Sequence, residues 1–294
     1  MRGKIRNGWE LSKQSWAALR SNPQLVVFPI ISMIGMIVVT ILFFIPISAT
    51  GIVSALVNDG GIADNMAAIV SAVVLFIYYL VAYTVTIFSN TALVGAAMKL
   101  VRGEPATVSD GIQIAMSRIS KIIVYALISA TIGMIARSIR ESGRRSDNLL
   151  VAILTGIIGG LIQGTWNLLV FFAIPVLVVE NIGVIDSLKR SLEIFKKTWG
   201  EGFVGSTAIG GITCLAYLAV IVIGGVLIFL AVSTGTAALI IGAVALVVLA
   251  FIFLGLLQGA VNGVFQASLY NYAQTGDAGR FIDTELARQA FLPA

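Results

Sequence analysis

The chain has 294 residues, of which 58% are hydrophobic and only 11% are charged, and its mean hydropathy is +1.00. Soluble domains carry about 25% charged residues, so this composition excludes an ordinary soluble protein. The formal net charge is +5, but no nucleic-acid-binding motif is present, and no nucleic-acid partner is expected. Because the chain has no histidine, it lacks the commonest general base and metal ligand. We expect no enzyme activity, no cofactor and no metal.

Six apolar runs are long enough to form helices that cross a membrane, which takes about 20 residues each. The first run is longer than the hydrophobic region of a signal peptide, so we expect it to be retained. Cys214 is the only cysteine, which excludes an intrachain disulfide. The sequence therefore predicts an all-α polytopic membrane protein, with residues 1–294 forming one membrane domain. The expected spans lie near residues 24–48, 66–100, 119–136, 149–180, 205–232 and 236–271.

Lysine and arginine residues lie mainly before the first span, in the second and fourth connections, and in the C-terminal tail. The positive-inside rule places these segments, and both termini, on the cytoplasmic side of a cell membrane. Anionic lipid at the cytoplasmic face is therefore an expected partner. The third connection breaks the pattern, because it lies on the outer side and still carries four arginines.

A short amphipathic segment precedes each odd-numbered span, starting at Trp9, Ser109 and Ile185. In each copy apolar or small residues follow helical 3-4-3 spacing, and an acid comes directly after the first of them. The pattern predicts three helix-pair pseudo-repeats, near residues 1–104, 105–181 and 182–276, with 277–294 as a cytoplasmic tail. The amphipathic segments are interpreted as helices in the headgroup plane. The alternative is a cytoplasmic collar that binds a partner.

Two similar eight-residue segments, GLIQGTWN from Gly160 and GLLQGAVN from Gly255, lie 95 positions apart on the fourth and sixth spans. Glycines at GxxxG spacing let helix backbones approach, and amides form hydrogen bonds across the interface. We therefore predict a packed interface between the even-numbered helices, and a polar layer lining a solute path is the alternative. The expected packing glycines are Gly156, Gly160, Gly164, Gly255, Gly259 and Gly263, and the expected polar layer comprises Asn90, Gln163, Asn167, Gln258, Asn262 and Gln266.

The arginine-rich third connection has the sequence ARSIRESGRRSD. Its charges have i, i+4 and i+7 spacing, which indicates an extension of the third helix with internal ion pairs. The alternative is a site for anionic headgroups or polymers on the outer face. The candidate contacts of such a site are Arg137, Arg140, Arg144 and Arg145.

The stretch IPVLVVENIGVIDSLKRSLEIFKKTWGE, which includes Pro175, Glu180, Gly183 and Ser191, carries a family resemblance. It resembles a pattern from an uncharacterised six-span prokaryotic integral membrane protein family. It is also similar to the membrane domain fused to some glycerophosphodiester phosphodiesterases. The resemblance implies a six-span all-α membrane domain and supplies no catalytic activity, because the phosphodiesterase chemistry belongs to a separate domain.

Composition and the missing catalytic groups favour a non-enzymatic, lipid-interacting membrane protein that acts as a scaffold or an accessory subunit. The alternative function is a channel or transporter for a small or lipidic solute through the interface of the even-numbered helices. Whether the chain binds a protein partner or forms a homo-oligomer stays open.

Overall fold

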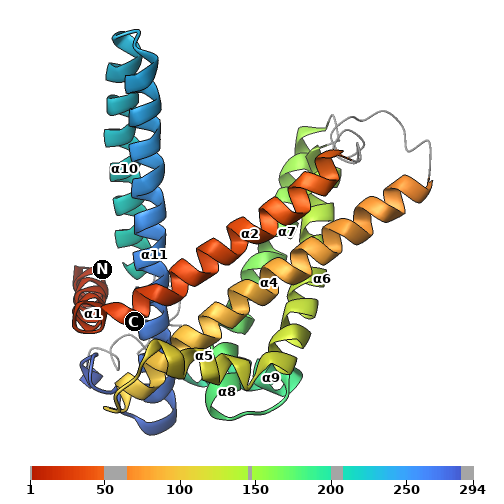
Figure 1. The fold of residues 1–294 in the computed structure, drawn as a ribbon. Coiled ribbons are helices and arrows are strands. Elements are labelled where there is room, and N and C mark those ends of the chain that lie inside the picture. The colour runs from red at the N-terminus through yellow and green to blue at the C-terminus, as the bar shows by residue number, and fades with distance from the viewer. Residues whose placement is uncertain (1, 50–64, 145–147, 200–207, 286–294) are drawn as a thin grey trace. The chain divides into compact units, whose positions relative to one another are not determined.

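The computed structural model describes residues 2–49, 65–144, 148–199 and 208–285, which are drawn as ribbons in Figure 1. Every regular element in these residues is a helix, and none of them lies in a strand. The elements are α1 (Arg2–Ser21), the 3-10 turn η1 (Pro23–Val26), α2 (Val27–Ala49), α4 (Asn65–Val101), α5 (Val108–Met116), α6 (Ile119–Arg144), α7 (Leu149–Phe171), α8 (Ala173–Val179), α9 (Val184–Trp199), α10 (Ala208–Ser233) and α11 (Ala237–Thr275).

Six helical segments in the described residues are long and apolar enough to cross a membrane, as the sequence predicts. They are Pro23–Ile45, Ala72–Val101, Ile119–Arg144, Leu149–Val179, Cys214–Ser233 and Ala237–Thr275. At about 1.5 Å per residue, the 39 residues of α11 are far longer than the hydrocarbon core is thick. The long return helix expected from the sequence is therefore present.

The third span is longer than predicted, because α6 continues to Arg144 instead of ending at residue 136. Arg137, Arg140 and Arg144 are thus helical, and the expected limit of the third span at residue 136 is too short. Arg145 lies outside the described residues. The helix continues because its polar residues are adequate helix formers and because Arg137 pairs with Glu141 one turn later. This is the helix extension that the charge spacing indicates.

The described helices fall into two compact units, each made of several chain segments. The first unit takes the described residues of Met1–Ile30, Ala96–Val108 and Glu193–Ala294, and the second takes those of Ile31–Gly95 and Ser109–Leu192. Each unit is described by itself below.

The second unit contains an antiparallel pair formed by α6 and α7 (Figure 1). Glycines make the close approach of the two helices possible. A Cβ atom added to Gly159 would lie 2.6 Å from Cγ of Arg140, and one added to Gly143 would lie 2.8 Å from Cβ of Thr155. Both distances are below what real side chains allow, so each glycine leaves the space that its neighbour fills.

Two short helices of the second unit are joined to the ends of the longer helices. The Ile114 side chain of α5 packs against Gly95 of α4. The backbone N–H of Phe172, at the break between α7 and α8, donates to Oγ of Ser191 on α9 at 3.2 Å. The break is explained by Pro175, which has no N–H to continue the helical hydrogen bonds. This hydrogen bond joins α9 to the break between α7 and α8.

The first unit contains the α10–α11 pair, with α1 packed on both helices. Gly224 admits the side chain of Val247, and the rings of Tyr217 and Phe251 stack with centroids 5.7 Å apart. Most other side chains of the pair are exposed. The described part of α10 and the first half of α11 therefore offer most of their apolar surface to their surroundings, whereas residues 260–271 of α11 are largely buried.

A strap after α11 ties three parts of the first unit together. The strap comprises residues 276–285. The N–H of Arg280 donates to the carbonyl of Val101 at 3.2 Å, and the N–H of Asp283 donates to Oε1 of Gln14 at 2.9 Å. The side chain of Ile282 is buried. The first part of the predicted tail is thus docked on the end of α4 and on the side of α1.

Substitution of Gly159 by leucine is expected to lower the free energy of unfolding by about 1–3 kcal/mol, the usual cost of overpacking. Gly156 on the same helix has no atom within 4 Å of an added Cβ, so Gly156→Leu is the matched control and is expected to leave stability nearly unchanged. The measurement is the thermal unfolding midpoint of each variant in detergent. An equal loss from Gly156→Leu would contradict this structure of α7 and would favour the predicted glycine interface instead.

The strap is expected to loosen in acid. The N–H of Gly279 and the hydroxyl of Thr284 donate to Oδ1 of Asp277, and these bonds lower the pKa of that carboxyl below its ordinary value of 3.8. The stabilisation by the carboxylate is therefore complete above that ordinary value and is lost as pH falls through the lowered pKa. Amide hydrogen exchange at Gly279 should show protection falling over that range. Asp277→Asn should give lower protection without this pH dependence, and an unchanged profile would contradict the assignment.

Candidate functional site

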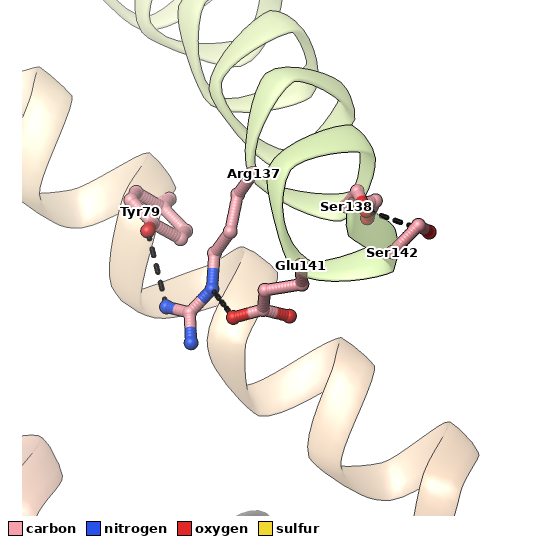
Figure 2. Close-up of polar contacts among 5 residues, drawn as sticks. All are labelled: Tyr79, Arg137, Ser138, Glu141 and Ser142. Carbon is pink, nitrogen blue, oxygen red and sulfur yellow. Dashed lines mark hydrogen bonds and ion pairs between the residues drawn. The ribbon is translucent and has the colours of Figure 1, made fainter. Parts of the chain in front are cut away.

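The candidate site is a group of polar side chains where α4 passes the last turns of α6. We call Tyr79, Tyr83, Arg137, Arg140 and Glu141 the arginine–tyrosine cluster. All five residues belong to the second unit and lie on α4 and α6, which each contain a span that is apolar enough to cross a membrane. Figure 2 shows Arg137 extending from α6 between the ring of Tyr79 and the carboxylate of Glu141.

Arg137 is paired within the cluster. Its Nε donates to Oε1 of Glu141 at 2.7 Å, and its Nη1 donates to the hydroxyl of Tyr79 at 3.3 Å. The side chains of Arg137 and Glu141 are 42% and 44% exposed, so in water such a pair would contribute only about 0–1 kcal/mol. Next to lipid the same pair neutralises a charge that would otherwise be costly.

Arg140 has no such partner. Its aliphatic stem packs against Gly159, and its Nη1 donates to the carbonyl of Gly159 at 3.4 Å. It forms no ion pair with any carboxylate in the described part of the chain. With Arg137 balanced by Glu141, the cluster keeps one net positive charge, and that charge belongs to Arg140.

A row of aromatic rings supports the cluster from α4. The rings of Tyr79 and Tyr83 stack with centroids 6.2 Å apart, and Tyr78 meets Tyr79 edge-on at 5.8 Å. The hydroxyl of Tyr83 lies against Gly133, one turn before Arg137 on α6. The rings therefore hold two hydroxyl groups beside the arginines.

The tyrosines are functional candidates that sequence reasoning missed. The available signal is a run of three tyrosines, Tyr78, Tyr79 and Tyr83, inside an apolar span. Their relation to the arginines cannot be read from spacing, because Tyr79 and Arg137 are 58 positions apart.

The predicted packing glycines have different surroundings on the two helices. On α7, no described atom lies within 4 Å of a Cβ added to Gly156, Gly160 or Gly164. On α11, an added Cβ at Gly259 would lie 3.4 Å from Cγ of Pro29 on α2, and one at Gly255 would lie 3.7 Å from the hydroxyl of Tyr217. Gly263 is buried. The contacts described for these glycines are therefore those of Gly259 with α2 and of Gly255 with α10.

The predicted polar layer stays a prediction. The Gln163 side chain donates to Oδ1 of Asn167 at 3.2 Å, which is a bond within α7 rather than between helices. Asn90, Asn167 and Asn262 are exposed, and Gln163, Gln258 and Gln266 are half-buried. As for metals, no group of three acidic, cysteine or histidine side chains is gathered in the residues that the structure describes.

Six long apolar helices and a polar cluster on two of them define a multi-pass membrane protein. Residues 69–281 match the sequence model of a family of unknown function, DUF6159. The match covers well over half of the chain, so the chain belongs to this family, and the matched range includes the whole arginine–tyrosine cluster. No curated protein matches the chain. Nothing in these comparisons connects it with the glycerophosphodiester phosphodiesterases.

Substitution of Glu141 by glutamine is expected to lower the free energy of unfolding by about 1 kcal/mol, because Arg137 loses its charged partner while half-exposed. Ser142→Ala is the matched control, since the Ser142 hydroxyl donates only along its own helix, to the carbonyl of Ser138 at 3.0 Å (Figure 2). The measurement is the unfolding midpoint in detergent. Equal unfolding midpoints for Glu141→Gln and Ser142→Ala would show that the ion pair between Arg137 and Glu141 contributes nothing to the stability of the fold.

Proposed function

We propose that the protein is a non-enzymatic, lipid-interacting membrane scaffold or accessory subunit of the cell membrane, with both termini in the cytoplasm. One observation carries the proposal. None of the residues in the most apolar 18-residue stretch of α11 is buried, and only 11% of the residues in the corresponding stretch of α10 are buried. Helices that are apolar on all sides and still exposed are solvated by lipid chains or by another membrane protein. A role in organising lipid or a partner subunit uses this surface directly.

The three predicted pseudo-repeats are part of this proposal. Support comes from two contacts with the same spacing along the chain: Ile114 packs against Gly95, Ser191 binds Phe172, and both pairs are 19 positions apart. Each contact joins an amphipathic helix to the end of the return helix that precedes it. In the first unit α1 packs on α11, which is the corresponding pairing of the first amphipathic helix with the last return helix. This pattern favours three copies of one helix-pair design.

We further assign α1, α5 and α9 to the headgroup plane of the cytoplasmic leaflet. Apolar side chains on these helices are exposed, including Trp16, Met116 and Ile185, and they are suited to insertion among lipid headgroups. The guanidinium of Arg20 lies 5.6 Å from the centre of the Trp16 ring. Basic side chains beside interfacial aromatic rings favour contact with anionic lipid on this side.

Reconstitution distinguishes this role from the alternative of a channel or transporter. The protein in vesicles containing phosphatidylglycerol is expected to retain lipid through purification and to leave the vesicles as impermeable as protein-free controls. The measurements are lipid content after extraction and release of small fluorescent or ionic solutes. Solute flux that disappears when Asn90, Asn167 and Asn262 are all replaced by leucine would overturn the scaffold proposal and favour transport through the polar layer.

A further inference from the structure

We infer that Arg140, with Arg137 and Tyr79 beside it, binds the phosphate of an anionic phospholipid headgroup. The inference rests on the lipid-interacting function proposed above and adds to it a site and a ligand class. Three observations carry it: the uncompensated charge, its depth along α6, and the apolar surface around it.

The first observation is the charge. A guanidinium group has five N–H donors, and among the described residues Arg140 uses them for one long hydrogen bond, to the carbonyl of Gly159. The Arg140 stem is fixed against Gly159, so its head is held in place rather than free to sample solvent. A fixed guanidinium with free donors matches the geometry of a phosphate, which accepts two parallel N–H bonds.

The second observation is depth. Lys121 lies near the start of α6, where its Nζ binds both the carbonyl oxygen and Oδ1 of Asn181 at 2.5 Å. The positive-inside rule places these polar groups at the cytoplasmic boundary of the hydrocarbon. Arg140 comes 19 positions later, which is about 28 Å along a helix, and the hydrocarbon core is about 30 Å thick. Arg140 therefore reaches the opposite boundary, where lipid phosphates lie.

The third observation separates a lipid from a free anion. On the side of Arg140 that faces the membrane interior, the surfaces of α6 and α7 are apolar and exposed, with Ile135 at 50% and Leu161 at 64%. A water-soluble anion gains nothing from this surface, whereas the acyl chains of a phospholipid whose phosphate binds Arg140 can lie along it. We therefore commit to a lipid phosphate as the ligand.

Native mass spectrometry of the full chain in mild detergent tests the site, with phosphatidylglycerol and zwitterionic phosphatidylcholine as probes. The wild type is expected to bind phosphatidylglycerol in preference. Arg140→Gln is expected to weaken that binding roughly ten-fold or more, as for loss of hydrogen bonds to a charged group. Arg144→Gln is the matched control, since it removes the same charge from an exposed position one turn further along α6, and it is expected to bind like the wild type.

Arg140→Lys keeps the charge and the aliphatic stem, so it replaces Arg140→Gln in the test if that variant fails to fold. It is expected to bind phosphatidylglycerol more weakly than the wild type, because lysine lacks the planar guanidinium with its paired N–H donors. Equal binding by Arg140→Gln or Arg140→Lys and the wild type would overturn the site. Equal losses from Arg140→Gln and Arg144→Gln would also overturn it, by showing diffuse attraction only. Displacement of the lipid by excess sodium phosphate would identify a free anion as the ligand. A wild type that retains neither lipid would instead contradict the proposed function itself.

Discussion

Lipid solvates an apolar helix about as well as a second apolar helix does, so burial of apolar surface gives these spans little reason to associate. The structure depends instead on places where a glycine allows a neighbour to come close. Gly35 admits Val85 between α2 and α4, Gly159 admits the Arg140 stem between α6 and α7, and Gly224 admits Val247 between α10 and α11. Dispersion contacts at such points are dense, and between them the helices remain exposed to lipid. This explains how a chain can have defined helix pairs and still bury so little of its apolar surface.

The same constraint explains the arginine–tyrosine cluster. A charge near hydrocarbon must be paired, hydrogen-bonded or extended to the interface. Arg137 meets this demand within the protein through Glu141 and Tyr79. Arg140 meets only part of it, because its stem is held against Gly159 by the approach of α7. The contact that joins α6 to α7 thus also fixes a charge that its own surroundings do not balance.

Hydropathy predicted the number and approximate limits of the spans, because length and apolar content decide whether a helix can cross a membrane. It could not predict which face of α7 packs, because the amides of Gln163 and Asn167, which mark one face, bond to each other within the helix and do not require a neighbouring helix. GxxxG spacing pointed to Gly156, Gly160 and Gly164, whereas α6 contacts Gly159. The shape of the partner decides the face: the Arg140 stem and the carbonyl of Ala136 need the space at Gly159. The pairing of Tyr79 with Arg137 depends on how α4 and α6 pack, which no local spacing encodes.

The stretch that carries the family resemblance has a structural explanation in this fold. The Ser191 hydroxyl accepts a hydrogen bond from the N–H of Phe172 at the α7–α8 break, Arg190 pairs with Glu180 at 3.4 Å, and the Ser187 hydroxyl donates to the carbonyl of Gly183 at 2.8 Å. These bonds close a tight joint between a return helix and the next amphipathic helix, and each of these polar groups has its partner there. A joint whose polar groups are paired maintains the fold and has little left with which to bind a ligand. Arg140 differs in that its position is fixed and the described residues leave most of its donors unused. In a membrane protein that combination is a physical reason to look for a ligand there.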